Sequence, residues 1–311
     1  MKYRKLGKSN LLVSEVGFGT WGIGGISYGP TDDDESVRAL QNAFDKGINF
    51  YDTSNSYGRS EELIGKALKH VRDEVFIATK VGCLPHTGRV MPQDFSIGHI
   101  KQSIEDSLRR LKTDYIDLYQ LHSPSTDILC NDEVIGALED LRKEGKVRAI
   151  GVSVRSPDDS LIALERFDCV QVNFNMVDQR LLENNLLGLA VRKGVGIIVR
   201  TPFVFGFLTG SYTENTTFAS DDHRLNWSEE QLRRWAKSSR LFVSLCENCT
   251  LAQLALRFCL TYEGVSTVIP GMMKCWEVEE NVACSVLGNL TVKELAFIRE
   301  IYEANTFFVE K

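Results

Sequence analysis

Four residues that can hold or move a proton occur in the first half of the chain: Asp52, Tyr57, Lys80 and His122. A phenol has a pKa near 10 and donates its proton poorly at neutral pH, but a neighbouring ammonium lowers that pKa. A carboxylate can keep the ammonium charged and oriented, and an imidazole can donate a hydrogen bond to the same substrate oxygen. Together, the four residue types suit protonation of an oxygen on which negative charge develops.

Each of these residues also has a simpler explanation. Asp52 can cap a turn, Lys80 can be a solvated strand end, and a lone histidine such as His122 is usually structural. The four include no nucleophile with a base and no metal cluster, so another group has to deliver the electrons. A bound nicotinamide would supply them as hydride.

The elements that would position these side chains alternate along the chain. Strands are expected in the short apolar runs 16–19, 48–52, 75–80, 116–122, 147–153, 169–174, 196–200 and 266–270. Helical periodicity follows in 32–47, 60–71, 97–112, 131–145, 156–167, 180–194, 250–264 and 274–288. Strands alternating with helices in this number predict an α/β protein, a parallel sheet closed into a (β/α)8 TIM barrel.

The barrel explains why the four residues would meet. Asp52, Lys80 and His122 end three successive strands, and Tyr57 lies in the loop after Asp52. The carboxyl ends of parallel barrel strands face one shared mouth. We therefore expect the four side chains to converge there.

The remaining segments are expected to complete one domain, residues 1–311. Residues 3–15 predict a β-hairpin before the first barrel strand, with residues 8–10 as its turn. Two pieces exceed the simple repeat, namely residues 203–247 and a final helix near 291–304.

Composition excludes several other classes of protein. The 311 residues are 43% hydrophobic and 25% charged, and the formal net charge of -6 includes no basic run that would suit nucleic acid or a membrane surface. No apolar stretch approaches the roughly 18 to 20 residues of a membrane span, and the start does not read as a signal peptide. Cys246 and Cys249 form a CxxC, but no second pair accompanies it, so we expect reduced thiols, no metal site and a cytoplasmic protein.

Eight motifs together resemble one known family, the aldo-keto reductases, over essentially the whole chain. They are GFGTW (17–21), NFYDTSNSYGRSEELIG (49–65), IATK (77–80), DYIDLYQLH (114–122), GKVRAIGVS (145–153), QVNFN (171–175), TPFVFGFLTG (201–210) and VIPGMMKCWEVEEN (268–281). The resemblance implies that Tyr57 is the acid, that Lys80 and Asp52 tune it, and that His122 orients the substrate. It also implies substrate contacts by Trp21, Tyr57 and His122.

The resemblance further implies an extended nicotinamide cofactor, and no GxGxxG follows a strand to suggest a Rossmann domain instead. The nicotinamide half would lie near Asp52, Gly19, Thr20 and Trp21, with Ser153 and Gln171 on its carboxamide and Arg200 stacked on its ring. Backbone N–H groups would hold the pyrophosphate in the loop containing Thr201, Pro202, Phe203, Gly206, Leu208, Thr209 and Gly210, which can also be read as an ordinary glycine-containing loop. The adenosine end would meet Gly271, Lys274, Glu277, Glu280 and Asn281.

Two departures from the family pattern affect the cofactor. Val154 stands where the family commonly has Asn, so one carboxamide hydrogen bond is missing or moved. After Pro270 there is no Arg to pair with the 2′-phosphate of NADP; Glu277 instead suits ribose hydroxyls. The family norm is NADP, and Glu277 shifts the expectation towards mixed use or NAD. The alternative is that Lys274 suffices for NADP and Glu277 points to solvent.

The loops around the mouth should select the substrate. Trp227, Phe307 and Phe308 are candidate apolar walls with Trp21 and Tyr57, although aromatic residues are more often core. Polar groups in HTGRV and SDDHRLNW suit a hydroxylated, sugar-like carbonyl compound, and His86 and His223 in these loops are expected at the surface.

The sequence thus predicts an NAD(P)-dependent oxidoreductase acting on an aldehyde or ketone, with a small carbonyl compound as its partner. A second reading is a cofactor-binding regulatory module like the β-subunits of potassium channels, which the four residues do not exclude. A metal-dependent barrel lyase would need several ligands at the mouth, where only His122 is well placed.

Overall fold

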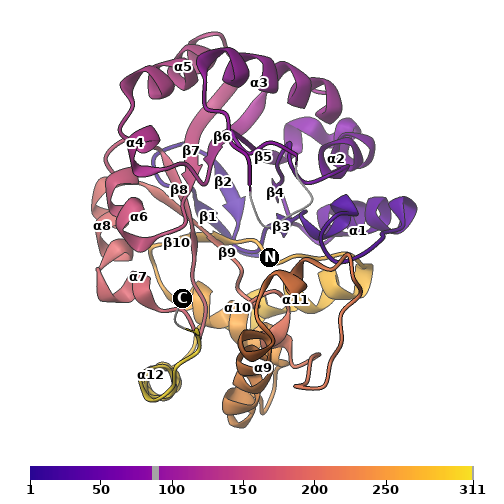
Figure 1. The fold of residues 1–311 in the computed structure, drawn as a ribbon, viewed down its shortest axis with the longest axis vertical. Coiled ribbons are helices and arrows are strands. Elements are labelled where there is room, and N and C mark those ends of the chain that lie inside the picture. Colours follow the sequence, from indigo (N-terminus) through magenta and orange to yellow (C-terminus); the bar gives the residue numbers. More distant parts are fainter. Residues whose placement is uncertain (86–90, 310–311) are drawn as a thin grey trace.

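A computed structural model describes residues 1–85 and 91–309 and has a (β/α)8 barrel at its centre (Figure 1). The eight parallel strands are β3 (Phe18–Gly19), β4 (Phe50–Asp52), β5 (Phe76–Val81), β6 (Ile116–His122), β7 (Val147–Ser153), β8 (Cys169–Asn173), β9 (Gly196–Arg200) and β10 (Val265–Val268). Each strand pairs with the next one in the sequence, as expected from the alternating pattern. The predicted fold class is confirmed.

Backbone contacts between the two outermost strands close the sheet. Gly17 N donates to Val268 O at 2.8 Å, and Gly19 N donates to Pro270 O at 2.9 Å. A Cβ on Gly19 would lie 2.7 Å from the carbonyl oxygen of Ile269, so the closure requires glycine at this position.

Helices surround the barrel, as Figure 1 shows. They are α1 (Asp33–Asp45), α2 (Ser60–Leu68), α3 (Ile97–Leu111), α4 (Thr126–Leu129), α5 (Asp132–Lys143), α6 (Pro157–Ala163), α7 (Arg180–Glu183), α8 (Leu186–Lys193), α9 (Glu229–Ser238), α10 (Leu251–Thr261), α11 (Cys275–Leu287) and α12 (Val292–Ala304). Several of their N-termini are capped by side chains, for example by Ser96 on α3 and by Thr250 with Gln253 in a capping box on α10. No helix in the described residues is long and apolar enough to cross a membrane.

The predicted N-terminal hairpin is confirmed as β1 (Tyr3–Lys5) paired with β2 (Leu12–Ser14). Asn10 adopts the left-handed conformation in its turn, with φ of 62°. Leu6, Leu11 and Val13 of the hairpin join a buried cluster with Phe50 and other side chains from inside the barrel. The hairpin thereby seals one end of the barrel and leaves the strand C-termini at the other end for the site.

Two parts of the chain differ from the expected elements. The single helix predicted over 180–194 is two helices, α7 and α8, because Asn185 takes the left-handed conformation with φ of 54° between them. The long piece 203–247 is built from α9 and three 3₁₀ turns, η3 (Phe207–Thr209), η4 (His223–Asn226) and η5 (Ser239–Leu245). Helical periodicity predicted helix over 180–194 but could not predict the interruption at Asn185.

Candidate active site

Asp52 and Lys80 form a buried ion pair at the ends of β4 and β5. Lys80 Nζ donates to Asp52 Oδ1 and, at 2.8 Å, to the carbonyl oxygen of Thr53. The Lys80 side chain is 0% exposed and that of Asp52 is 3% exposed. Parallel pairing puts Asp52 beside Ala78, two residues before Lys80, so both side chains reach the same mouth.

Tyr57 lies directly against this pair. Lys80 Nζ is 4.8 Å from the centroid of the Tyr57 ring. Tyr57 is carried by a turn in which its N–H donates to Ser54 O at 3.0 Å, and its ring is only partly buried. The phenol therefore contacts the ammonium on one side and remains accessible from the mouth.

The pKa of Tyr57 is raised from its ordinary value, which corrects one expectation. Burial is the largest cause of the rise, and it outweighs Lys80, whose positive charge lowers the pKa as predicted; Asp52 raises it further. Burial also disfavours the charged form of Lys80, but Asp52 and Tyr57 raise the pKa of Lys80 above its ordinary value. Tyr57 is thus a protonated phenol beside a charged ammonium at neutral pH.

His122, at the end of β6, completes the group. Its ring meets that of Tyr57 edge to face, with centroids 5.7 Å apart and planes at 81°. Nδ1 lies 3.2 Å from the Oγ of Ser54. The structure therefore brings together all four residues that the sequence singled out for proton chemistry.

A buried amide network, which sequence reasoning missed in part, holds the second oxygen of Asp52. Gln171 Nε2 donates to Asp52 Oδ2 at 2.7 Å, and Gln120 Nε2 donates to it at 3.1 Å. Ser153 Oγ donates to Gln171 Oε1 at 3.1 Å. Ser153 and Gln171, expected at the nicotinamide carboxamide, are thus linked to Asp52. The signal for Gln120 was its position two residues before His122, which puts both side chains on the same face of β6.

The predicted nicotinamide surface has one donor without a partner. Arg200, at the end of β9, donates from Nη2 to the carbonyl oxygen of Val154 at 3.0 Å, while its buried Nε has no hydrogen-bond partner in the described part of the chain. Thr20 Oγ1 donates to Asp52 O at 2.9 Å and fixes the segment carrying Trp21. A planar guanidinium with an unpaired donor beside the catalytic group fits a flat nicotinamide ring.

The predicted pyrophosphate loop, 201–210, has a strained backbone. Thr201, Val204 and Phe205 have positive φ values of 54°, 48° and 57°, and Gly206 follows at 96°. Such strain clusters at functional sites. Six N–H groups of the loop already donate within it, those of Val204, Gly206, Phe207, Leu208, Thr209 and Gly210. A pyrophosphate would therefore have to rearrange this loop or use its other donors, which the sequence could not indicate.

Glu277 has a role that neither sequence alternative anticipated. Its Oε2 accepts hydrogen bonds from the backbone N–H groups of Met273 at 2.6 Å and Lys274 at 3.1 Å, and so caps the N-terminus of α11. The carboxylate is partly buried, and burial raises its pKa despite these two hydrogen bonds. Of the neighbouring predicted contacts, Lys274 and Gly271 are exposed and Asn281 is buried.

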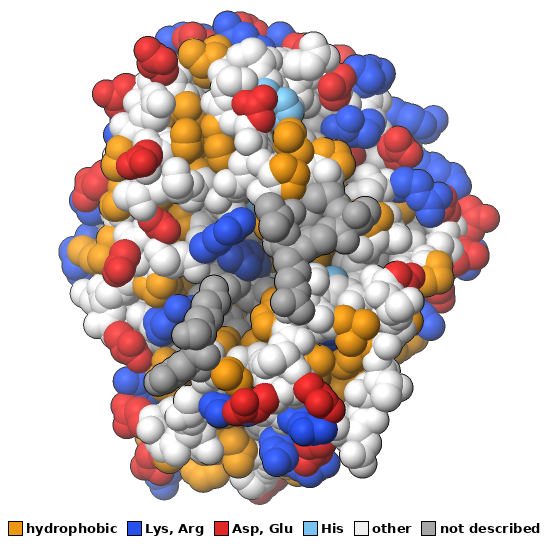
Figure 2. Space-filling model, viewed as in Figure 1, with side chains coloured by type: hydrophobic (Ala, Val, Ile, Leu, Met, Phe, Trp, Pro, Cys, Tyr) orange, Lys and Arg blue, Asp and Glu red, His pale blue; other side chains and the backbone are white. Residues whose placement is uncertain are grey.

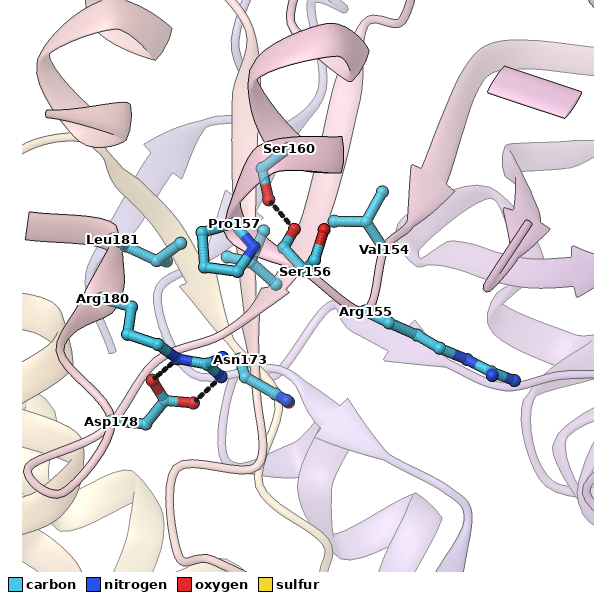
Figure 3. A pocket seen from close by; sticks show the side chains of 10 residues that line it. Val154, Arg155, Ser156, Pro157, Ser160, Asn173, Asp178, Arg180 and Leu181 are labelled. Carbon is cyan, nitrogen blue, oxygen red and sulfur yellow. Dashed lines mark hydrogen bonds and ion pairs between the residues drawn. The ribbon is translucent and has the colours of Figure 1, made fainter. Parts of the chain in front are cut away.

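A small cleft lies beside this arrangement at the ends of β7 and β8 (Figure 3). It is lined by Val154, Arg155, Ser156, Pro157, Ser160, Val172, Asn173, Asp178, Arg180 and Leu181. Two of its charged groups, Asp178 and Arg180, already pair, with two hydrogen bonds of 2.7 Å. None of the four proton-transfer residues lines it, but it shares Val154 with the predicted nicotinamide surface. On the face shown in Figure 2, Lys and Arg side chains lie beside the central hollow, which favours an anionic ligand such as a dinucleotide.

Aromatic side chains line the mouth, but not all of the predicted ones. Trp21 lies 6.2 Å from Tyr57 between ring centroids, and Trp227 belongs to the same cluster through Phe205, at 4.4 Å. Phe307 is 5% exposed and packs in the core, so its expected role as a pocket wall is wrong. Phe308 is 41% exposed and packs beside Trp235.

The expectation that His223 is a surface residue is met only in part, because the residue is half-buried. Its ring packs 4.3 Å from Trp21 and 4.5 Å from Trp227 between centroids. Burial lowers the pKa of His223 to about 4, so the ring is neutral near pH 7. His86 and most of HTGRV lie outside the described residues.

The eight cysteines, all within the described residues, form no disulfide bonds. Cys246 and Cys249 interact with each other, and burial is the largest cause that raises the pKa of Cys246 to about 11. Among residues 1–85 and 91–309, no group of three or more His, Cys, Asp or Glu side chains could hold a metal ion.

Comparisons with known proteins cover the whole barrel. A profile of the Aldo/keto reductase family matches residues 15–303. The solved structure of the aldo-keto reductase AKR11C1 from Bacillus halodurans, in its holo form, superposes with a TM-score of 0.81 at 34% identity, covering 100% of this chain and 98% of that one. The NADH-specific methylglyoxal reductase of Escherichia coli (strain K12) is 30% identical, covering 98% of this chain and 99% of that protein. A probable voltage-gated potassium channel subunit beta of Arabidopsis thaliana is 30% identical, covering 98% of this chain and 97% of that protein.

Proposed function

Because this chain belongs to the aldo/keto reductase family, we propose that it reduces an aldehyde or ketone to the alcohol, or catalyses the reverse reaction, with a nicotinamide cofactor and with Tyr57 as general acid. The observation that carries the proposal is the contact of Lys80 with both Asp52 and the ring of Tyr57 at the barrel mouth. A proton donor and a fixed cation beside it are what a developing alkoxide requires.

The side chains have separate tasks in this reaction. When bound, the cofactor supplies the hydride that is added to the carbonyl carbon. Tyr57 donates its phenolic proton to the carbonyl oxygen as negative charge develops there. Lys80, kept charged by Asp52, stabilises the phenolate that remains. His122 donates a hydrogen bond to the substrate oxygen and orients the carbonyl.

Several groups would hold the cofactor. The amides around Asp52 are connected through Gln171 and Ser153, so a carboxamide would join an existing network. Arg200 would contact the nicotinamide ring, with its unpaired Nε as a further donor. The other proposed contacts are Gly19, Thr20, Trp21, Thr201, Pro202, Phe203, Gly206, Leu208, Thr209, Gly210, Gly271, Lys274, Glu280 and Asn281.

For the adenosine end, we propose a preference for NADH over NADPH. The helix N-terminus after Pro270 would bind a 2′-phosphate through backbone N–H groups. Glu277 already occupies two of these donors, those of Met273 and Lys274, and adds a negative charge that repels a phosphate. The NADH-specific relative from Escherichia coli is compatible with this preference.

Substitution of Tyr57 tests the assigned acid. Tyr57→Phe should lower kcat with NADH and a panel of aldehydes and ketones by about 10²- to 10⁴-fold, because it removes the general acid and keeps the ring. Cofactor affinity, measured by quenching of tryptophan fluorescence, should stay close to that of the unsubstituted protein. Tyr3→Phe, at a tyrosine that is 46% exposed, controls for loss of a phenol. Near-normal turnover by Tyr57→Phe would show that another group donates the proton.

A regulatory module is the second candidate, favoured by the similarity to the potassium channel subunit beta. It predicts tight cofactor binding with negligible turnover of any carbonyl compound and a stable complex with a channel-like partner. A steady-state assay over the aldehyde and ketone panel separates the two candidates, since multiple turnovers per protein molecule are expected only of the enzyme.

A further inference from the structure

His223 lies in the aromatic wall next to the proposed acid. Its ring centroid is 4.3 Å from that of Trp21. The ring of Tyr57 also lies near Trp21, with the two centroids 6.2 Å apart. Phe205 and Trp227 complete the wall around the imidazole, at 5.2 and 4.5 Å. Trp21 thus contacts both the proposed acid and His223, so a substrate chain that followed Trp21 away from Tyr57 would approach the imidazole.

The backbone on both sides of His223 is fixed. His223 N donates to Ser27 O at 2.7 Å, which ties the turn η4 to the loop after β3. Asp222 caps this turn through a hydrogen bond from Arg224 N at 2.8 Å, and its carboxylate pairs with the Arg224 guanidinium at 2.6 Å. That guanidinium also lies 4.7 Å from the ring of Tyr28. The backbone that carries the imidazole is thus held in place before any ligand binds.

One ring nitrogen of this imidazole has no protein partner in the described residues. Nδ1 is buried without a hydrogen bond to any residue within 1–85 or 91–309. Buried polar atoms in proteins are nearly always paired, and each exception requires an explanation. A phenylalanine would fill an apolar wall without this cost, whereas a neutral imidazole both donates and accepts a hydrogen bond.

We propose that His223 is a substrate-positioning residue that forms a hydrogen bond with a hydroxyl group of the carbonyl substrate. The enzyme then favours hydroxyaldehydes and hydroxyketones over their deoxygenated analogues. This inference rests on the proposed function, because it needs a carbonyl substrate at Tyr57. It gives the substrate a class that neither the fold nor the four proton-transfer residues determine.

The test compares glyceraldehyde with 2-methylbutanal, in which methyl groups replace both hydroxyls. The ratio of the two kcat/KM values is measured for the unsubstituted enzyme, His223→Phe and His223→Asn. His223→Phe should lower the ratio by about 5- to 10-fold, the usual value of one hydrogen bond, and the change should appear mainly in KM for glyceraldehyde. His223→Asn, which keeps a donor and an acceptor, should recover part of the ratio. His70→Phe, at an exposed histidine, should not change it.

An unchanged ratio in His223→Phe, or an equal loss for both aldehydes, would overturn the inference, because a packing role affects both substrates alike. Reduction of 2-methylbutanal by the unsubstituted enzyme separates the two proposals, since it supports the proposed function whatever His223 does. If the unsubstituted enzyme reduced neither aldehyde, the proposed function and the role of His223 would both be rejected.

Discussion

The ammonium nitrogen of Lys80 lies 4.8 Å from the centre of the Tyr57 ring. Lys80 is fully buried and Tyr57 is partly open to the mouth, so the cation contacts the phenol from the protein side. Asp52 compensates the buried charge by accepting a hydrogen bond from Nζ. Burial of a lone ammonium would be very costly, and the lysine would lose its proton. The ion pair with Asp52 therefore allows Lys80 to stay charged against Tyr57 although its side chain is shielded from solvent.

Removal of the cation should affect activity and stability together. Lys80→Met leaves the Asp52 carboxylate buried without its cationic partner, and we expect a loss of about 3 kcal/mol in the free energy of unfolding. Two amide donors, Gln120 and Gln171, still bond this carboxylate, so the loss should fall at the lower end of the range for broken buried pairs. Urea denaturation and kcat with a fixed aldehyde measure the two effects.

The surface pair Lys66–Asp34 provides the matched control for that variant. Its nitrogen and oxygen are 3.1 Å apart, but the side chains are 55% and 73% exposed. Lys66→Met should change the free energy of unfolding by less than about 1 kcal/mol, because exposed ion pairs contribute little. Equal losses in Lys66→Met and Lys80→Met would contradict the role assigned to burial.

The pH dependence of the reaction follows from the raised pKa of Tyr57. Reduction requires the protonated phenol, and burial keeps the pKa of Tyr57 above its ordinary value of 10. The kcat for carbonyl reduction should therefore be level from pH 7 to about 9 and should fall only as the pH rises through the pKa of Tyr57. Stopped-flow measurement of NADH oxidation at saturating substrate gives this profile. A decline beginning near pH 7 would mean that Lys80 lowers the pKa of Tyr57 more than burial raises it.

The sequence predicted the strands and the convergence of Asp52, Lys80 and His122 because both follow from alternation and from the parallel direction of the strands. It could not assign a partner to Glu277, since a carboxylate three residues after the N-cap of a helix suits both helix capping and hydrogen bonding to a ribose. The packing of His223 was missed for a different reason. Its loop has no periodic pattern, so the sequence gives no sign that the chain folds back and brings His223 against Trp21.

Glu277 should control the choice of cofactor. Glu277→Ala frees the N–H groups of Met273 and Lys274 and removes a negative charge, so affinity for NADPH should rise relative to NADH by about 10-fold or more. The same change should cost about 1 kcal/mol of stability because a capping interaction is lost. Titrations of both cofactors, followed by tryptophan fluorescence, give the ratio of Kd values.

The capping box of α12 separates these effects. Glu294 accepts a hydrogen bond from Thr291 N at 2.6 Å at the start of α12, as Glu277 does from Lys274 N at 3.1 Å at the start of α11. Glu294→Ala should lose similar stability and leave the cofactor ratio unchanged. A ratio that also stayed constant in Glu277→Ala would reject the proposed preference for NADH.

His223 should make the folded state sensitive to mild acid. Its pKa is lowered from 6.5 to about 4 by burial, so the unfolded chain binds a proton between these values and the folded chain does not. Stability is therefore complete above pH 6.5 and falls as the pH decreases towards 4, and at pH 5 the loss from this one ring is about 2 kcal/mol. The free energy of unfolding at pH 7 minus that at pH 5 should consequently be smaller in His223→Phe by about this amount. In His70→Phe, at an exposed histidine, the difference between the free energies of unfolding at pH 7 and pH 5 should equal that of the unsubstituted protein. If this difference in the free energy of unfolding were the same in His223→Phe and in the unsubstituted protein, the imidazole would have to be protonated in the folded state at pH 5. The prediction would then be wrong.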